Sequence, residues 1–355
     1  MHKTVLITGL VLSLSAATLA AIGEWAADGF GPSGADAAPS SSISSSTEHA
    51  ESRLPAMPPA IASSIPATPA VYPSSAPGYT IRSTVPEVRL QFTVADERGH
   101  PVQNLSVDDV RILDNQSPVD KLHDFARDED LPLRLGIVLD ASDSVKRVLP
   151  EEKAAAIKFL DQILRPQTDR AFVLAFGADV QVWQGSTNDR AVLTDAVKRV
   201  HQPGWGTSLF DALYLACADH LSKDQSGTVV HRAIVVVTDG EDTESHHDLH
   251  DVVAIAQRTE TQIYTLTVHG RRPITYGDAV LQRLAEETGG RFLIAPSAQN
   301  LEGAFTEIEQ EMRSQYCIFF PPHQPTPGFH SLEVQVRAPE RLQIHARQGY
   351  YALPQ

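Results

Sequence analysis

The feature that most constrains the fold is an alternation of short apolar runs with longer helical stretches in the middle of the chain. The apolar runs are short and largely continuous, and they occupy residues 133–140, 170–177, 232–239 and 262–268. Helical stretches separate or follow them, at residues 151–164, 189–200, 208–221, 248–258 and 279–288. Continuous apolar strands between amphipathic helices predict an α/β, doubly wound, mostly parallel sheet with helices on both faces.

Two flanking segments show a different pattern, in which apolar and polar residues alternate as they do in half-buried strands. In residues 87–128 and 315–355 the apolar positions are Val88, Leu90, Phe92 and Val94, and Leu332, Val334, Val336, Leu342 and Ile344. Each segment offers about three strands with one apolar face, which is marginal as an independent unit. We therefore predict one small β-sandwich built from both segments, with the α/β domain of residues 129–314 inserted between them.

The N-terminal part of the chain is predicted to lie outside the fold. His2 and Lys3 precede a largely apolar run over residues 5–22, which is typical of a secretory signal occupying residues 1–27. An uncleaved anchor is the alternative, because the run is just long enough to span a bilayer. Residues 28–86 are rich in proline and serine and are predicted to be a disordered linker. Either reading predicts an extracytoplasmic protein, secreted or held in the cell envelope.

Length, charge and cysteine content narrow the classes of function. The 355 residues suffice for two domains plus tails. A formal net charge of -15 argues against a nucleic-acid partner, which needs a basic face, but it is compatible with bound cations. Cys217 and Cys317 cannot make a disulfide framework, and Cys217 lies in an apolar pattern typical of a core.

Short oxygen-bearing side chains gather where the apolar strands end. Asp140, Ser142 and Ser144 follow the first strand, Asp239 ends another, and Thr207 follows a glycine-bracketed loop at the start of a helix. Ligands of open α/β sheets bind at the carboxyl ends of the strands. Carboxylate and hydroxyl oxygens suit hard divalent cations, and two aspartates balance one dication. Taken singly, each of these residues could instead be a helix cap or a turn residue.

These three pieces together resemble the von Willebrand factor type A domain and its metal-ion-dependent adhesion site. That site reads D-x-S-x-S, then T, then D, and it is matched here by Asp140, Ser142, Ser144, Thr207 and Asp239. The resemblance spans roughly residues 131–314, and the flanks are similar to bacterial secreted type A-related proteins.

The resemblance implies a six-stranded, mostly parallel sheet and a bound Mg²⁺, with Mn²⁺ or Ca²⁺ as alternatives. The serines would ligate the ion directly, Thr207 would do so directly or through water, and the aspartates would bind the ion or its waters. A partner usually donates a carboxylate to the open position.

Four other polar residues near the motif have both a functional and a structural interpretation. Asp143 stands where the family often has glycine, and it is interpreted as a solvated loop side chain, although its charge could tune the choice of metal. Asp211 either supports the metal ligands by hydrogen bonds or is exposed on a helix. His246 and His250 have helical spacing that could suggest zinc, but a surface helix is the preferred interpretation because no third ligand has matching spacing.

Three classes of function remain open. The first is a non-enzymatic adhesion or scaffolding module whose metal grips an acidic group on an unknown protein partner. The second is a structural envelope protein whose metal site has no ligand. The third is a hydrolase, with Asp140 as nucleophile or a metal-activated water, but no general base, nucleophile elbow or phosphate loop is evident. The choice of partner is expected to depend on loops at residues 184–190, 201–206 and 240–247.

Overall fold

The computed structural model describes residues 87–127, 131–201, 205–222, 229–268, 274–324, 326–338 and 341–352. The predicted signal at residues 1–27 and the predicted linker at residues 28–86 lie outside the described residues. None of the described helices has both the length and the apolar character needed to cross a membrane. Cys217 and Cys317 are both buried and are not bonded to each other.

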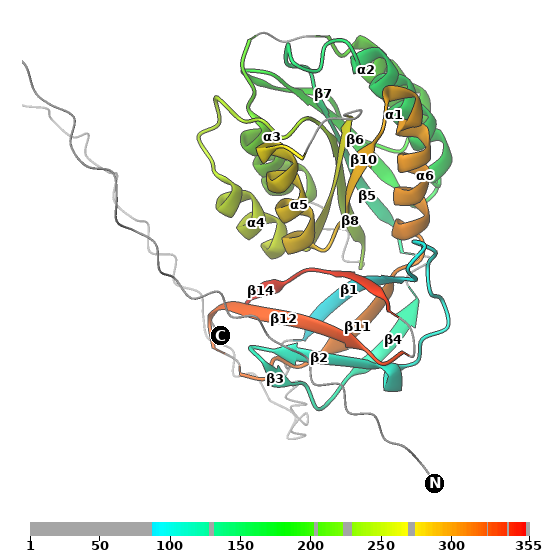
Figure 1. The fold of residues 1–355 in the computed structure, drawn as a ribbon, viewed down its shortest axis with the longest axis vertical. Helices are drawn as coiled ribbons and strands as arrows, with labels where there is room; N and C mark the ends of the chain where they lie inside the picture. The colour runs from blue at the N-terminus through cyan, green and yellow to red at the C-terminus, as the bar shows by residue number, and fades with distance from the viewer. Residues whose placement is uncertain are drawn as a thin grey trace, which may run out of the picture. The chain divides into compact units, whose positions relative to one another are not determined.

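A six-stranded sheet forms the centre of the α/β domain (Figure 1), with the strand order β10-β9-β8-β5-β6-β7. Five strands are parallel: β5 (Leu133–Asp140), β6 (Arg170–Phe176), β8 (His231–Val237), β9 (Thr261–Val268) and β10 (Phe292–Ala295). The edge strand β7 (Val180–Thr187) runs antiparallel to β6. The predicted α/β fold with a mostly parallel sheet is therefore confirmed.

Helices cover both faces of this sheet (Figure 1). One face carries α1 (Leu149–Ile163), α2 (Arg190–Arg199) and α6 (Leu301–Met312), whose apolar sides share one core with the sheet. The other carries α3 (Leu209–Leu215), which continues as a π-helical turn (Ala216–Leu221), together with α4 (Leu249–Arg258) and α5 (Tyr276–Thr288). The central strands are largely apolar because both of their faces are buried.

The flanking segments form two antiparallel four-stranded sheets that pack on a common core, as the sequence predicted. One sheet has the order β13-β1-β11-β4, from β13 (Gln343–Ala346), β1 (Val88–Ala95), β11 (Tyr316–Phe320) and β4 (His123–Arg127). The other has the order β14-β12-β2-β3, from β14 (Gly349–Ala352), β12 (Gly328–Val336), β2 (Val110–Asp114) and β3 (Ser117–Pro118). Each segment contributes four strands, one more than expected, and each sheet contains strands of both segments.

Strand β1 differs from its prediction as a half-buried strand, because nearly all of it is buried. Its apolar residues enter the core of the sandwich, while its polar residues face the α/β domain. Arg89 Nη2 lies 2.6 Å from Glu260 Oε2, and Thr93 Oγ1 donates a hydrogen bond to Glu311 Oε1 (3.2 Å). The alternating pattern is present, but the polar face is covered by a second domain rather than by water.

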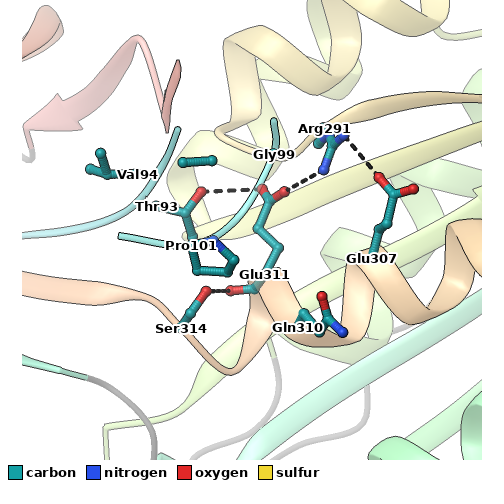
Figure 2. A pocket seen from close by; sticks show the side chains of 10 residues that line it. Thr93, Val94, Gly99, Pro101, Arg291, Glu307, Gln310, Glu311 and Ser314 are labelled. Carbon is teal, nitrogen blue, oxygen red and sulfur yellow. Dashed lines mark hydrogen bonds and ion pairs between the residues drawn. The ribbon is translucent and has the colours of Figure 1, made fainter. Parts of the chain in front are cut away.

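Glu311, at the end of α6, is the centre of a second polar contact between the sandwich and the α/β domain (Figure 2). Besides Thr93, its carboxylate contacts His345 Nδ1 at 2.9 Å and Arg291 Nη1 at 3.5 Å, and Arg291 also pairs with Glu307 at 2.9 Å. Because Arg89 also contacts Val230, just before β8, the sandwich adjoins the amino ends of the parallel strands. The predicted site lies at the opposite, carboxyl end of these strands.

Candidate metal centre

Three neighbouring strands bring the five predicted site residues to the carboxyl edge of the sheet. Strand β5 lies between β8 and β6, with Leu139 opposite Val237 and Asp140 opposite Phe176. Asp140, at the end of β5, and Asp239, directly after the end of β8, therefore lie at neighbouring strand ends. The loop that carries Thr207 joins the same edge through the bond from Ser208 N to Gly177 O (2.7 Å), directly after β6.

The carboxylate of Asp140 is fully buried and held by two hydrogen bonds. Its Oδ1 accepts from Ser142 N (2.8 Å), and its Oδ2 accepts from Thr238 Oγ1 (2.6 Å). Thr238 Oγ1 in turn accepts from Gly240 N (3.1 Å), so this residue ties the Asp239 loop to Asp140. Thr238 was not predicted as a site residue, although its place directly before Asp239 at a strand end is a signal that the sequence carries.

The two motif serines present their hydroxyl groups together. Ser142 is 3% exposed and Ser144 is exposed, and their Oγ atoms lie 3.1 Å apart. Two hydroxyl oxygens that lie within hydrogen-bond distance of each other can both face a single ion. The pair therefore fits the part of two neutral oxygen ligands.

Thr207 is positioned by the loop that follows Asp239. Its N–H donates to Thr243 Oγ1 (3.0 Å), and Thr243 N donates back to Thr207 O (2.9 Å). Asp242 Oδ1 accepts from Phe210 N (3.1 Å) and so caps the first turn of α3. The loops that carry Thr207 and Asp239 therefore hold each other in place, and a change in one will move the other.

The electrostatics of the site favour a bound cation. Burial raises the pKa of Asp140 to about 6 despite the hydrogen bonds from Ser142 and Thr238, and the nearby carboxylate of Asp239 adds to the rise. Two carboxylates and three hydroxyls at one strand edge form an all-oxygen donor set. The residues present therefore fit a hard divalent cation, whose charge would offset the repulsion between the two aspartates.

Asp211 has a role that neither sequence interpretation anticipated. Its carboxylate accepts hydrogen bonds from the backbone of His246 (3.1 Å) and His247 (2.9 Å), and it contacts the Nδ1 atoms of both rings. Although partial burial opposes the change, these hydrogen bonds lower the pKa of Asp211. Asp211 therefore anchors the loop before α4.

The other polar residues lie at the surface. The Asp143 carboxylate is 39% exposed and lies 3.8 Å from Lys146 Nζ, in agreement with a solvated side chain. His246 is 91% exposed in a loop, and His250 is exposed in the first turn of α4. Asp248, His250 and Asp251 place ligand atoms within 4.8 Å of one another, but the two aspartates already form the reciprocal cap of α4.

One loop expected around the metal lies at the other end of the sheet. Residues 184–187 belong to β7, and Thr187 is opposite Ala171 near the start of β6. Because β7 is antiparallel, the stretch 184–190 leads away from the site. Of the second loop, residues 201–206, residues 202–204 lie outside the described residues.

A close contact between two glycines fixes the backbone under Asp239. Gly240 has φ 80°, and a Cβ there would meet Gly277 O at 2.4 Å. A Cβ on Gly277 would meet Asp239 O at 2.2 Å. Only glycine allows the first turn of α5 to approach this loop so closely.

We expect Gly277→Ala to destabilise the protein by about 1–3 kcal/mol, as overpacking does, and to weaken metal binding by displacing Asp239. Chemical denaturation and a metal titration measure the two effects. Gly303→Ala is the matched control, since a Cβ on this helical glycine meets nothing within 4 Å. Gly303→Ala should stabilise the protein by about 0.5–1 kcal/mol. Equal changes in stability and in metal affinity for the two substitutions would contradict the packing argument.

The raised pKa of Asp140 predicts opposite pH dependences for stability and for metal affinity. In the metal-free protein the group favours the folded state below its unfolded pKa of 3.8, and this contribution is lost as pH rises through about 6. The loss is about 3 kcal/mol. Metal binding needs the ionised carboxylate, so affinity should fall roughly tenfold per pH unit below about 6. Denaturation with and without Mg²⁺ between about pH 4.5 and 7.5 measures both, and a metal affinity that is flat over this range would contradict the prediction.

The family model of the von Willebrand factor type A domain matches residues 135–307. A comparison with curated proteins finds no match.

Several solved structures are similar in fold. Proximal thread matrix protein 1 of the mussel byssus is 15% identical, with a TM-score of 0.46 over 60% of this chain and 50% of that one. This chain thus spans about half the length of the mussel protein, of which another structure has a zinc-occupied adhesion-site motif. BatB of Bacteroides thetaiotaomicron is 19% identical (TM-score 0.41, 51% of this chain, 100% of that one). The corresponding domain of the pilus tip protein Mfa5 of Porphyromonas gingivalis is 15% identical (TM-score 0.42, 51% and 94%).

Proposed function

Because residues 135–307 form a von Willebrand factor type A domain, we propose that the chain is a binding module whose metal ion grips a carboxylate of a partner protein. The ion is held by Asp140, Ser142, Ser144, Thr207 and Asp239. Mg²⁺ is the first candidate, with Mn²⁺ and Ca²⁺ as alternatives. The observation that supports the proposal is that the strand ends and loops that carry these five oxygen-bearing side chains meet at the carboxyl end of the sheet.

The charge of the ligand set supports a carboxylate as the outside ligand. Asp140 and Asp239 supply two negative charges, and the hydroxyl ligands are neutral. One dication in this site is therefore balanced rather than over-neutralised, and because its other protein ligands are neutral hydroxyls it can still accept one more oxygen from outside. A partner carboxylate provides that oxygen.

Large apolar side chains beside the site support a protein rather than a small anion as partner. Trp205 is 83% exposed two residues before Thr207, and Tyr276 is 87% exposed at the start of α5. Tyr276 also lines an open groove next to the Asp239 loop, together with Phe210, Glu241, Leu249, Val280 and Arg283. Exposed aromatic residues around a polar centre are typical of protein-binding surfaces.

A binding role is preferred over hydrolysis because the sequence has neither a nucleophile elbow nor a Gly-rich phosphate loop. His246 and His247 are the imidazoles of the loop after Asp239, and Asp211 engages the Nδ1 atom of each. These contacts order the loop that follows Asp239. The secretory signal predicted at residues 1–27 suggests that binding takes place outside the cytoplasm.

Capture by immobilised residues 79–355, which form one compact unit, tests the proposal. Extracellular and envelope proteins of the source organism would be applied with Mg²⁺, with a chelator, and with Mg²⁺ plus excess acetate or an acidic peptide. We expect the wild-type protein to capture a partner in Mg²⁺, and we expect both the chelator and the carboxylate competitor to abolish this capture. The Asp239→Asn variant should capture no partner. Capture that is unchanged by chelation would contradict a metal-dependent grip.

A further inference from the structure

Glu152, in the first turn of α1, is a buried acid outside the recognised motif. The residue is 1% exposed, and its Oε2 atom has no hydrogen-bond partner among the described residues. Its neighbour Glu151 has the same side chain but is exposed. Burial of a carboxylate without a partner is costly, so an unpaired oxygen at this position calls for a ligand.

The loop that carries the motif serines leads directly into the turn of Glu152. Val148 N and Leu149 N donate to the carbonyl of Val145, the residue after Ser144, and Glu152 N donates to Val148 O (3.0 Å). Burial raises the pKa of Glu152 well above the usual range, and the charges of Asp140 and Asp239 raise it further. Three acids are thus gathered in one region, two of them fully enclosed by protein. Like charges that share a buried site repel one another, and a divalent cation among them reverses the sign of the interaction.

We propose that Glu152 is a sixth residue of the metal site and acts on the ion through a bound water molecule. This proposal rests on the metal site of the proposed function. Mg²⁺ gives up its water reluctantly and usually keeps several molecules in proteins. Such waters need acceptors, and a carboxylate with a free oxygen is a strong one. Residues that orient ligands or waters around an ion typically change its affinity by about 10–100-fold when they are mutated.

A purely structural acid at this position has different consequences. A protonated Glu152 that serves only to fill the core contributes equally with and without metal. If Glu152 instead belongs to the metal site, its carboxylate lowers the stability of the metal-free protein and raises that of the metal-bound protein. Metal affinity and metal-free stability therefore change in opposite directions only if Glu152 serves the ion.

The test compares Glu152→Gln with Glu151→Gln in residues 79–355. Both changes remove one carboxylate from the same turn of α1, but only the first removes the buried one. We expect Glu152→Gln to weaken Mg²⁺ and Mn²⁺ binding about tenfold or more in calorimetry. Its metal-free melting temperature should equal or exceed that of the wild type. Glu151→Gln should bind both ions within about twofold of the wild type, as expected for a solvated surface charge.

Glu152→Met, which keeps the side-chain volume but has no polar head, should show the same loss of metal affinity. Equal metal affinities of Glu152→Gln and Glu151→Gln would overturn the role of Glu152 while leaving the proposed function intact. Failure of Glu152→Gln to fold would also overturn it, because the carboxylate would then serve the fold. A wild-type protein that binds no metal would overturn both proposals.

Discussion

Deletion of residues 315–355 is expected to unfold residues 87–127 and to leave the α/β domain folded. Strand β1 pairs with β11, from Val88 opposite Phe320 to Phe92 opposite Tyr316, and it pairs with β13 on its other side. Strand β2 pairs with β12. The deletion removes all these partners together with their half of the core of the sandwich. What remains of the sandwich is a two-residue pairing of β2 with β3 and an isolated bridge between Ala95 and Pro101, which are not stable in water.

The α/β domain should survive this deletion because it has two cores of its own, one on each face of its sheet. It will lose stability, since Glu260 loses its contact with Arg347 and, once β1 unfolds, its contact with Arg89 as well. Hydrogen exchange and limited proteolysis measure the outcome. We expect protection in the wild type and rapid exchange of residues 88–95 in the truncated chain, with a protease-resistant fragment near residues 131–314.

The reciprocal deletion of residues 87–127 is the control, and it should expose β11 and β12 in the same way. The shared sandwich is wrong if residues 88–95 stay protected after residues 315–355 are removed.

Replacement of Asp140 by Asn is expected to abolish metal binding while stabilising the metal-free protein. The buried carboxylate has a pKa raised to about 6, so its ionisation at neutral pH opposes folding. Asparagine is neutral and isosteric, and its oxygen can still accept from Ser142 N. We expect the free energy of unfolding of the metal-free protein to rise by about 1–3 kcal/mol at pH 7.5. Mg²⁺ affinity should fall by at least about 100-fold, because one of two balancing charges is lost.

Asp143→Asn is the matched control for this substitution. It removes a carboxylate from the same loop, but that carboxylate is 39% exposed and lies near Lys146. Its effects on stability and on metal affinity should both be small, as is usual for a surface charge. Thermal unfolding with and without Mg²⁺ separates the variants: the metal should raise the melting temperature of wild type and Asp143→Asn, and not that of Asp140→Asn. Equal metal-induced shifts in all three proteins would rule out Asp140 as a ligand.

The sequence predicted the central strands because continuous apolar runs have few other interpretations in a chain of this kind. It did not reveal β7 or β10. Strand β7 is an edge strand with a mostly half-buried, irregular pattern, and β10 has only four residues. Periodicity cannot reveal strands that are short or that lie at an edge. The direction of β7 also decided which loops flank the site, and strand direction is a property of the fold rather than of a local pattern.

Contacts between the domains were equally hard to predict. Arg89 and Glu260 are far apart in the sequence, yet they pair across the junction of sandwich and α/β domain at 2.6 Å. A polar residue on an alternating strand predicts a solvated face, and only tertiary structure shows that another domain covers it.

The placement of the candidate residues was largely predictable because they lie at strand ends and helix starts. Asp140, Ser142 and Ser144 lie in one short loop, and topology brings Thr207 and Asp239 to the same edge. Glu152 was not predictable, because in the sequence it looks like any acid in the first turn of a helix. Its burial follows from how α1 packs on the sheet, which no local pattern encodes.

Calorimetric titration of residues 79–355 with Mg²⁺, alongside Asp239→Asn, tests the central claim most directly. Asp239 is only partly buried, and its Oδ1 accepts from Glu241 N, so the isosteric change should leave the fold intact. We predict one ion bound per wild-type chain and no measurable binding to the variant. No binding to the wild type at about 10 mM Mg²⁺, above the range of weak extracellular sites, would contradict the account. So would equal affinity in the two proteins.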